Sequence, residues 1–158
     1  MLQLASENDT AAWAQALSKQ PALADAVLTL QGDLGAGKTT LVRYLLKALG
    51  VTGRIKSPTY AVLEPHEAPA GPTWPQGLVV SHFDFYRFAD PREWEDAGFR
   101  DVFAAPGLKL VEWPDKAGSL MPRPDLDLHL AITDGETREL TARAYTPRGL
   151  ALLKGEAP

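Results

Sequence analysis

The sequence predicts an α/β fold in which helices flank a central mixed β-sheet and the C-terminal part forms an antiparallel hairpin. An apolar run at residues 26–30 has the length of a buried strand, and a glycine-rich loop and a helical stripe of leucines over residues 40–49 follow it. Two further apolar runs, residues 78–84 and 108–112, also have strand length. Alternating apolar and polar residues over 126–144 then indicate two paired strands.

The chain is expected to begin with a helix. Ser6 and Asp9 have the Ser-x-x-Asp spacing of a capping box, which marks a helix N-terminus. This helix should run to about Ser18 and bury Trp13 and Leu17.

Proline and glycine dominate the predictions for the middle of the chain. Residues 53–59 have no clear period and are predicted to be a loop, and residues 60–64 have the composition of a strand. Residues 65–77 contain four prolines and two glycines, so we expect a loop there, without helix or central strand. The strand at 78–84 would then pair antiparallel with residues 60–64.

The chain from residue 90 onward is predicted to hold two helices and the hairpin. A helix is expected over residues 90–98, because Asp precedes it, Pro opens it and Glu follows in its first turn. The hairpin strands are residues 126–132 and 140–144, with a turn at Asp134-Gly135. A short helix is expected around residues 150–153.

Residues 32–39 read Gly-Asp-Leu-Gly-Ala-Gly-Lys-Thr and match the Walker A pattern G-x-x-x-x-G-K-[ST] completely. The glycines let the backbone turn so that successive N–H groups point at a phosphate, and the N-terminus of the following helix adds to the attraction. Lys38 supplies a positive charge for the β- and γ-phosphate oxygens, and the Thr39 hydroxyl is suited to Mg²⁺.

The flanking strand and helix distinguish this loop from a purely structural glycine turn, which is the alternative interpretation. The predicted fold is therefore P-loop NTPase-like, with a nucleoside triphosphate and Mg²⁺ as ligands. The candidate nucleotide-binding residues of the loop are Gly32, Asp33, Leu34, Gly35, Ala36, Gly37, Lys38, Thr39 and Thr40.

Hydrolysis also needs an acidic residue near Mg²⁺ and a group that orients the attacking water. Asp84 and Glu112 each end an apolar strand, where such acids are found, and spacing alone does not distinguish their roles. An ordinary salt bridge at a strand end is the alternative for each of them.

Other polar and aromatic residues have two interpretations each. Thr59, in Ser57-Pro58-Thr59, is a candidate sensor of the γ-phosphate or a hydroxyl cap of a turn. Arg87 could clamp phosphate, although a salt bridge is favoured. His82 is interpreted as a core histidine rather than a catalytic one, and Trp113 either belongs to the core or covers the nucleotide.

Composition limits the class of protein. The chain of 158 residues has the size of one domain, 1–158, whose last ten or so residues we expect to be loosely attached. Its net charge of −4 argues against binding nucleic acid through its own surface charge. It has no cysteine, no apolar run of membrane-spanning length and no signal-peptide pattern, so a cytoplasmic location is expected.

The motifs together resemble the TsaE (YjeE) family, the small ATPases of bacterial tRNA threonylcarbamoyladenosine synthesis. Their order and spacing agree over about residues 6–145, with a longer loop at 66–77 as the main departure. The combination is far more specific than the Walker A motif alone. The matching blocks are residues 32–41, Ser-Pro-Thr-Tyr at 57–60, His-Phe-Asp-Phe-Tyr-Arg at 82–87, Asp-Pro at 90–91 and Val-Glu-Trp-Pro at 111–114.

This resemblance implies an ATP- and Mg²⁺-dependent ATPase, slow by itself, that supports repeated turnover of the TsaB–TsaD transferase pair and meets tRNA only through these partners. It implies that Thr39 and Glu112 belong to the Mg²⁺ site, and that Asp84 supports water or switch geometry. It also implies that Thr10 lies near the nucleotide. Together with Lys38 and Thr59, which are selected from the motifs themselves, Asp84 and Glu112 make up the candidate catalytic residues.

Two other functions fit parts of the sequence. A small-molecule kinase would need a lid and an acceptor pocket, for which the chain has little length. A nucleotide-sensing binding module would keep the phosphate loop without a catalytic need for Asp84 and Glu112. A GTPase is disfavoured, because no Asn/Thr-Lys-x-Asp guanine motif is found in a suitable place.

Overall fold

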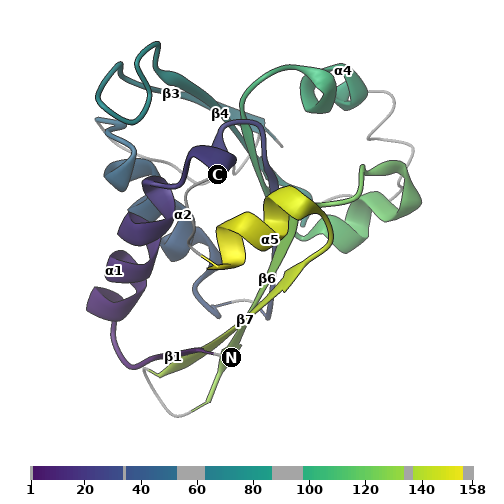
Figure 1. The fold of residues 1–158 in the computed structure, drawn as a ribbon. Helices are drawn as coiled ribbons and strands as arrows, with labels where there is room; N and C mark the ends of the chain where they lie inside the picture. Colours follow the sequence, from purple (N-terminus) through teal and green to yellow (C-terminus); the bar gives the residue numbers. More distant parts are fainter. Residues whose placement is uncertain (1, 34, 53–62, 87–97, 134–136, 155–158) are drawn as a thin grey trace.

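The structure, a computed structural model, describes residues 2–33, 35–52, 63–86, 98–133 and 137–154. Its strands form one mixed sheet in the order β1-β7-β6-β2-β5-β4-β3 (Figure 1). The strands are β1 (Leu2–Leu4), β2 (Val27–Gln31), β3 (Leu63–Ala68), β4 (Leu78–Asp84), β5 (Leu108–Glu112), β6 (Leu126–Ile132) and β7 (Arg138–Ala144).

The four central strands β6, β2, β5 and β4 run parallel, and the outer strands β7, β1 and β3 are antiparallel to their neighbours. Residues 27–30 of β2 and all of β5 are buried, as expected for strands that are covered on both faces and therefore read as continuous apolar runs. This confirms the predicted mixed α/β sheet and its C-terminal antiparallel hairpin, whose turn at 134–135 lies outside the described residues.

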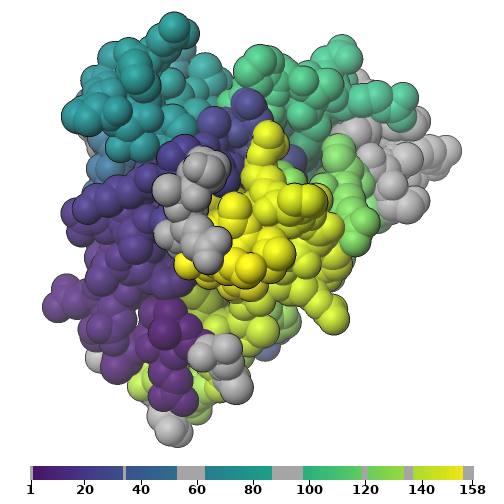
Figure 2. All heavy atoms as spheres, in the orientation of Figure 1, coloured from purple at the N-terminus to yellow at the C-terminus, as the bar shows by residue number. Residues whose placement is uncertain are grey.

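Helices cover the two faces of the sheet unequally. On one face α1, α2 and α5 pack over a leucine-rich core, and on the other α4 and η2 enclose a smaller aromatic cluster that includes Phe83 and Phe103 (Figure 1). Figure 2 shows α1 and α5 side by side on the first face, where both line one groove. The helices are α1 (Glu7–Ser18), η1 (Pro21–Leu23), α2 (Lys38–Ala48), α4 (Phe99–Ala104), η2 (Pro114–Leu120) and α5 (Pro147–Lys154).

The predicted N-terminal helix is confirmed as α1, but its capping box is not formed. The Ser6 side chain makes no capping hydrogen bond. The Asp9 carboxylate instead accepts a hydrogen bond from the Ala5 N–H, at 2.8 Å. Leu17 is buried as expected, whereas Trp13 is only half-buried against the core.

The prediction that residues 65–77 form a loop is wrong for residues 65–68, which belong to β3, although β3 lies at the sheet edge and is not a central strand. The strand tolerates proline because β3 is an edge strand that pairs only with β4, so a missing N–H can face away from the ladder. The antiparallel pairing with β4 was predicted, and it is confirmed for residues 63 and 64, while residues 60–62 lie outside the described part.

The C-terminal helix α5 is longer than the predicted 150–153. Its residues Gly149 and Leu152 are buried. Of the helix expected at residues 90–98, only Gly98 belongs to the described residues. The helix α4 begins directly after it, and the sequence pattern did not predict this element. No helix within the described ranges has the length and apolar character needed to cross a bilayer.

Candidate functional site

The glycine-rich loop lies at the C-terminal end of β2, between its neighbours β5 and β6. In open α/β sheets ligands bind at such a crevice outside the carboxyl ends of the strands. Position 32 requires a glycine, because a Cβ there would lie 2.3 Å from the Leu130 carbonyl oxygen. Gly37, with φ 107°, is the left-handed residue from which α2 begins.

The buried side of α2 fixes the loop against the sheet. Leu41, Val42, Leu45 and Leu46 are buried in the main core, so the N-terminal turn of this helix is held in place at the end of β2. The helix starts at Lys38, two residues before the predicted helical stripe. Its N-terminal N–H groups, together with those of the loop, form the kind of site that attracts a phosphate.

Lys38 is nearly buried, with 5% of its side chain exposed. Its Nζ donates hydrogen bonds to the carbonyl oxygens of Gly32 and Asp33 and lies 4.1 Å from the centroid of the Trp113 ring. Burial lowers the pKa of Lys38, and the nearby carboxylates of Glu112 and Asp84 oppose that shift. The ammonium group is thus held within the loop by backbone oxygens and an aromatic face.

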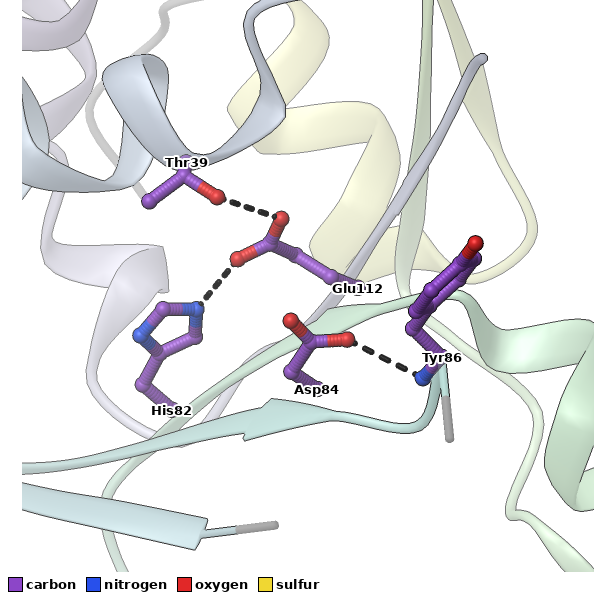
Figure 3. A network of polar contacts seen from close by, with 5 residues as sticks. All are labelled: Thr39, His82, Asp84, Tyr86 and Glu112. Atoms are coloured by element: carbon purple, nitrogen blue, oxygen red, sulfur yellow. Dashed lines mark hydrogen bonds and ion pairs between the residues drawn. The ribbon is translucent and has the colours of Figure 1, made fainter. Parts of the chain in front are cut away.

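The two predicted acids meet because β4 and β5 are parallel neighbours. Asp84 and Glu112 are register partners and point to the face of the sheet that carries α2. Glu112 is 2% exposed, and its Oε1 accepts a hydrogen bond from the Thr39 hydroxyl at 2.9 Å (Figure 3). The Mg²⁺ residues implied by the resemblance, Thr39 and Glu112, are therefore in direct contact.

Asp84 has a different environment from that of Glu112. Its carboxylate lies beside Glu112, and its Oδ1 accepts a hydrogen bond from the Tyr86 N–H at 3.0 Å (Figure 3). Burial is the main cause that raises the pKa of Asp84, and the charge of Glu112 raises it further. The Tyr86 ring in turn packs on Trp113, with 5.0 Å between the centroids.

Two of the pockets that adjoin the loop share Gly35, Gly37 and Thr40 in their lining. One, of about 480 Å³, lies between the loop, the start of α1 and β7, and Thr10 is part of its lining. The other, of about 300 Å³, is lined by Lys38, Thr39, Asp84, Glu112 and Trp113. A ligand that follows the loop would place one end in the larger pocket and the other beside the two acids.

Most of the predicted site residues come together at this loop, while three lie outside the described residues: Leu34, Thr59 and Arg87. The residues that converge are Thr10, Gly32, Asp33, Gly35, Ala36, Gly37, Lys38, Thr39, Thr40, Asp84 and Glu112.

Sequence reasoning did not select Arg138, and it read His82 as a core residue. Arg138 Nε donates a hydrogen bond to the Ala36 carbonyl at 3.1 Å, from a strand more than one hundred residues away, and no local motif marks it. His82 is indeed buried, but its Nε2 lies 2.6 Å from Glu112 Oε2. Its spacing of two from Asp84 along one strand places both side chains on one face, which was the available signal.

Within the described ranges no group of three or more His, Cys, Asp or Glu side chains is placed to hold a metal ion. Mg²⁺ does not require such a group, because it is typically bound through one or two carboxylates together with phosphate oxygens of the ligand and water. The hydroxyl and carboxylate oxygens of Thr39 and Glu112 are ligands of the hard type that Mg²⁺ prefers.

Comparison with known proteins agrees with this geometry. The family model described as "Threonylcarbamoyl adenosine biosynthesis protein TsaE" matches residues 4–140. The tRNA threonylcarbamoyladenosine biosynthesis protein TsaE of Haemophilus influenzae is 39% identical over 120 residues, which are 76% of this chain and 71% of that protein. The Bacillus subtilis protein of the same name is 35% identical over 122 residues, 77% of this chain and 72% of that protein.

A solved structure is similar over nearly the whole chain. The crystal structure of YdiB from Bacillus subtilis superposes with a TM-score of 0.74 at 28% sequence identity, and covers 97% of this chain and 90% of that one. The fold, the order of the motifs and the relatives thus agree, and the chain belongs to the TsaE family, whose role is in tRNA threonylcarbamoyladenosine biosynthesis.

Proposed function

We propose that this protein binds ATP with Mg²⁺ and hydrolyses it slowly by itself, and that this cycle supports repeated turnover of the TsaB–TsaD threonylcarbamoyl transferase pair. The observation that carries the nucleotide part is the contact between the Thr39 hydroxyl and the Glu112 carboxylate beside a complete Walker A loop. Family membership supports the choice of pathway and partners, and a role in tRNA modification supports a cytoplasmic location.

The two pockets suggest how the nucleotide would lie. The larger pocket, with Thr10 and Arg138 in its lining, has the volume to take a base and ribose. The smaller pocket brings Lys38 and the two acids to the position of the terminal phosphates. When bound, Mg²⁺ would neutralise charge that develops on the transferred phosphoryl group.

Each side chain has a role in this proposal that follows from its contacts. Lys38 would turn from the backbone oxygens of the loop to the β- and γ-phosphates. Thr39 and Glu112 would hold the metal, and Asp84 would orient the attacking water. The raised pKa of Asp84 is consistent with a group that can accept a proton from water in the site.

The test compares Lys38→Ala with Lys47→Ala, an exposed lysine in the last turn of the same helix. We expect Lys38→Ala to weaken ATP·Mg²⁺ binding or hydrolysis by at least about 10²-fold, as for the loss of one phosphate-binding charge. Lys47→Ala should match the wild type. Calorimetry and phosphate release, with and without the transferase pair, measure both quantities.

Unchanged binding and turnover in Lys38→Ala would overturn the nucleotide assignment. Tracing the phosphate separates the alternatives, because transfer to a small metabolite indicates a kinase. Binding without hydrolysis, even when the partners are present, would indicate a nucleotide-sensing module.

A further inference from the structure

We propose that His82 is a positioning residue, which holds the Glu112 carboxylate in the orientation required to bind Mg²⁺. The inference rests on the proposed function, because it concerns the same nucleotide and metal site. The contact that carries it is the hydrogen bond of 2.6 Å between His82 Nε2 and Glu112 Oε2 (Figure 3).

The carboxylate of Glu112 is held at both of its oxygens. Thr39 donates to Oε1, and His82 occupies Oε2. Thr39 is itself a candidate metal ligand, so it changes its interactions when the metal binds. His82 bonds the other oxygen, and this bond can keep Oε1 directed at the loop throughout.

Among the described residues, Glu112 is the one hydrogen-bond partner of the His82 ring. The ring is 1% exposed, and its neighbours on the same face of the sheet include Val80 and Leu110, which are also buried. A carboxylate only accepts hydrogen bonds, so the proton between the two groups is assigned to Nε2. The other nitrogen, Nδ1, is buried without a hydrogen-bond partner in the part of the chain that the structure describes.

Burial of the His82 ring costs free energy, which the hydrogen bond to Glu112 partly offsets. Burying a polar ring with one unpaired nitrogen is unfavourable, and a leucine next to Val80 and Leu110 would avoid that cost. A partner that orients a metal-binding carboxylate is commonly worth about 10- to 100-fold in metal affinity. The position of His82 therefore agrees better with support of Glu112 than with core packing alone.

Three variants separate orientation from packing. In His82→Gln the amide nitrogen has about the reach of Nε2 and can still donate to Glu112, whereas His82→Leu fills the space without a donor. His66→Leu is the matched control. It replaces another histidine of the same sheet face, with its own buried and unpartnered nitrogen, that has no contact with Glu112.

The measurement is ATP affinity as a function of Mg²⁺ concentration, by calorimetry, with ATP affinity in EDTA and thermal melting alongside. We expect His82→Leu to need about 10-fold more Mg²⁺ or higher for half of the metal-dependent gain in affinity, with unchanged affinity in EDTA. His82→Gln and His66→Leu should stay within about 2-fold of the wild type. If His82→Leu does not fold, His82→Asn, whose amide is too short to reach Glu112, should show the same Mg²⁺ defect.

Three results would overturn the positioning role: a wild-type Mg²⁺ requirement in His82→Leu, an equal defect in His66→Leu, or a defect in His82→Gln as large as that in His82→Leu. A wild-type protein that binds no ATP would instead overturn the proposed function. The two failures are thus distinguishable in one series of titrations.

Discussion

Asp84 and Glu112 end neighbouring strands in register, yet their surroundings differ. Glu112 is almost completely buried and hydrogen-bonded at both oxygens by the side chains of Thr39 and His82. Asp84 is less buried and receives a hydrogen bond from the Tyr86 backbone. Two carboxylates in different environments are suited to different tasks, as in many hydrolytic sites.

We therefore expect Glu112→Gln and Asp84→Asn to fail in different ways. Glu112→Gln removes the charge beside Thr39, so it should abolish most of the Mg²⁺-dependent gain in ATP affinity together with turnover. Asp84→Asn should lower turnover by at least about 10²-fold, the ordinary contribution of a general base, with little loss of affinity. Titrations of ATP·Mg²⁺ and single-turnover hydrolysis separate the two, and the reverse pattern would exchange the assignments.

The raised pKa of Asp84 also makes a prediction about stability without nucleotide. The folded chain holds this proton more tightly than the unfolded chain, so the contribution of Asp84 to stability is full below the ordinary pKa of aspartate. It is lost as pH rises through the raised value. At pH 7 Asp84→Asn should thus be more stable than the wild type. Urea unfolding from pH 7 to pH 4 should show this advantage shrinking, and a constant difference would contradict it.

At the scale of elements, Asp125 joins β2, β6 and α5. Its side chain accepts hydrogen bonds from the Val27 N–H at 2.8 Å and the Thr146 hydroxyl at 2.7 Å. Its backbone oxygen accepts from Tyr145 N–H at 3.0 Å. Gly149 of α5 lies against this same oxygen, so closely that a Cβ would be 1.7 Å from it.

Gly149→Ala should consequently destabilise the protein, although alanine is the better helix former. Alanine gains about 1 kcal/mol in helix propensity over glycine. Its Cβ would also push α5 away from Asp125, and overpacking of this kind costs about 1–3 kcal/mol, which outweighs that gain. Gly71→Ala, where a Cβ meets nothing within 4 Å, is the control and should change stability by less than about 0.5 kcal/mol. Thermal or urea unfolding measures both, and equal stability of the two variants would contradict the close contact.

At the scale of the whole molecule, the site lies where the sheet, α1, α2 and β7 meet, so the bound nucleotide can affect several surfaces together. A ligand shifts a partner equilibrium only through differential affinity, and coupling energies are typically about 1–3 kcal/mol. We expect affinity for the TsaB–TsaD pair to differ by roughly 5- to 150-fold between the ATP- and ADP-bound states.

Titration of the transferase pair with a non-hydrolysable ATP analogue and with ADP measures this difference. In multiple-turnover tRNA modification, the wild type should sustain product formation, whereas Lys38→Ala should stall it early. Equal affinity in both nucleotide states, or equal product with both chains, would contradict a role for the ATP cycle in partner turnover.

The loop motif, the buried strands and the helix that follows the loop could be predicted from local sequence, because each leaves a pattern within a few residues. Residues 32–39 carry the glycine-rich loop within one motif, and the apolar runs of β2 and β5 reflect burial on both faces. The amphipathic pattern of α2 likewise follows from the single core that it covers. These features could be predicted, since each depends on neighbours along the chain.

Only the tertiary structure decided the features that depend on pairing between distant segments. The place of β3 at the sheet edge made Pro65 acceptable in a strand, which its local composition argued against. The pairing of β4 with β5 brought the buried His82 into contact with Glu112, thirty residues further along the chain. The local spacing placed His82 and Asp84 on one face of a strand, but burial energy and strand order act over the whole molecule, so no local pattern identified Glu112 as the partner of His82.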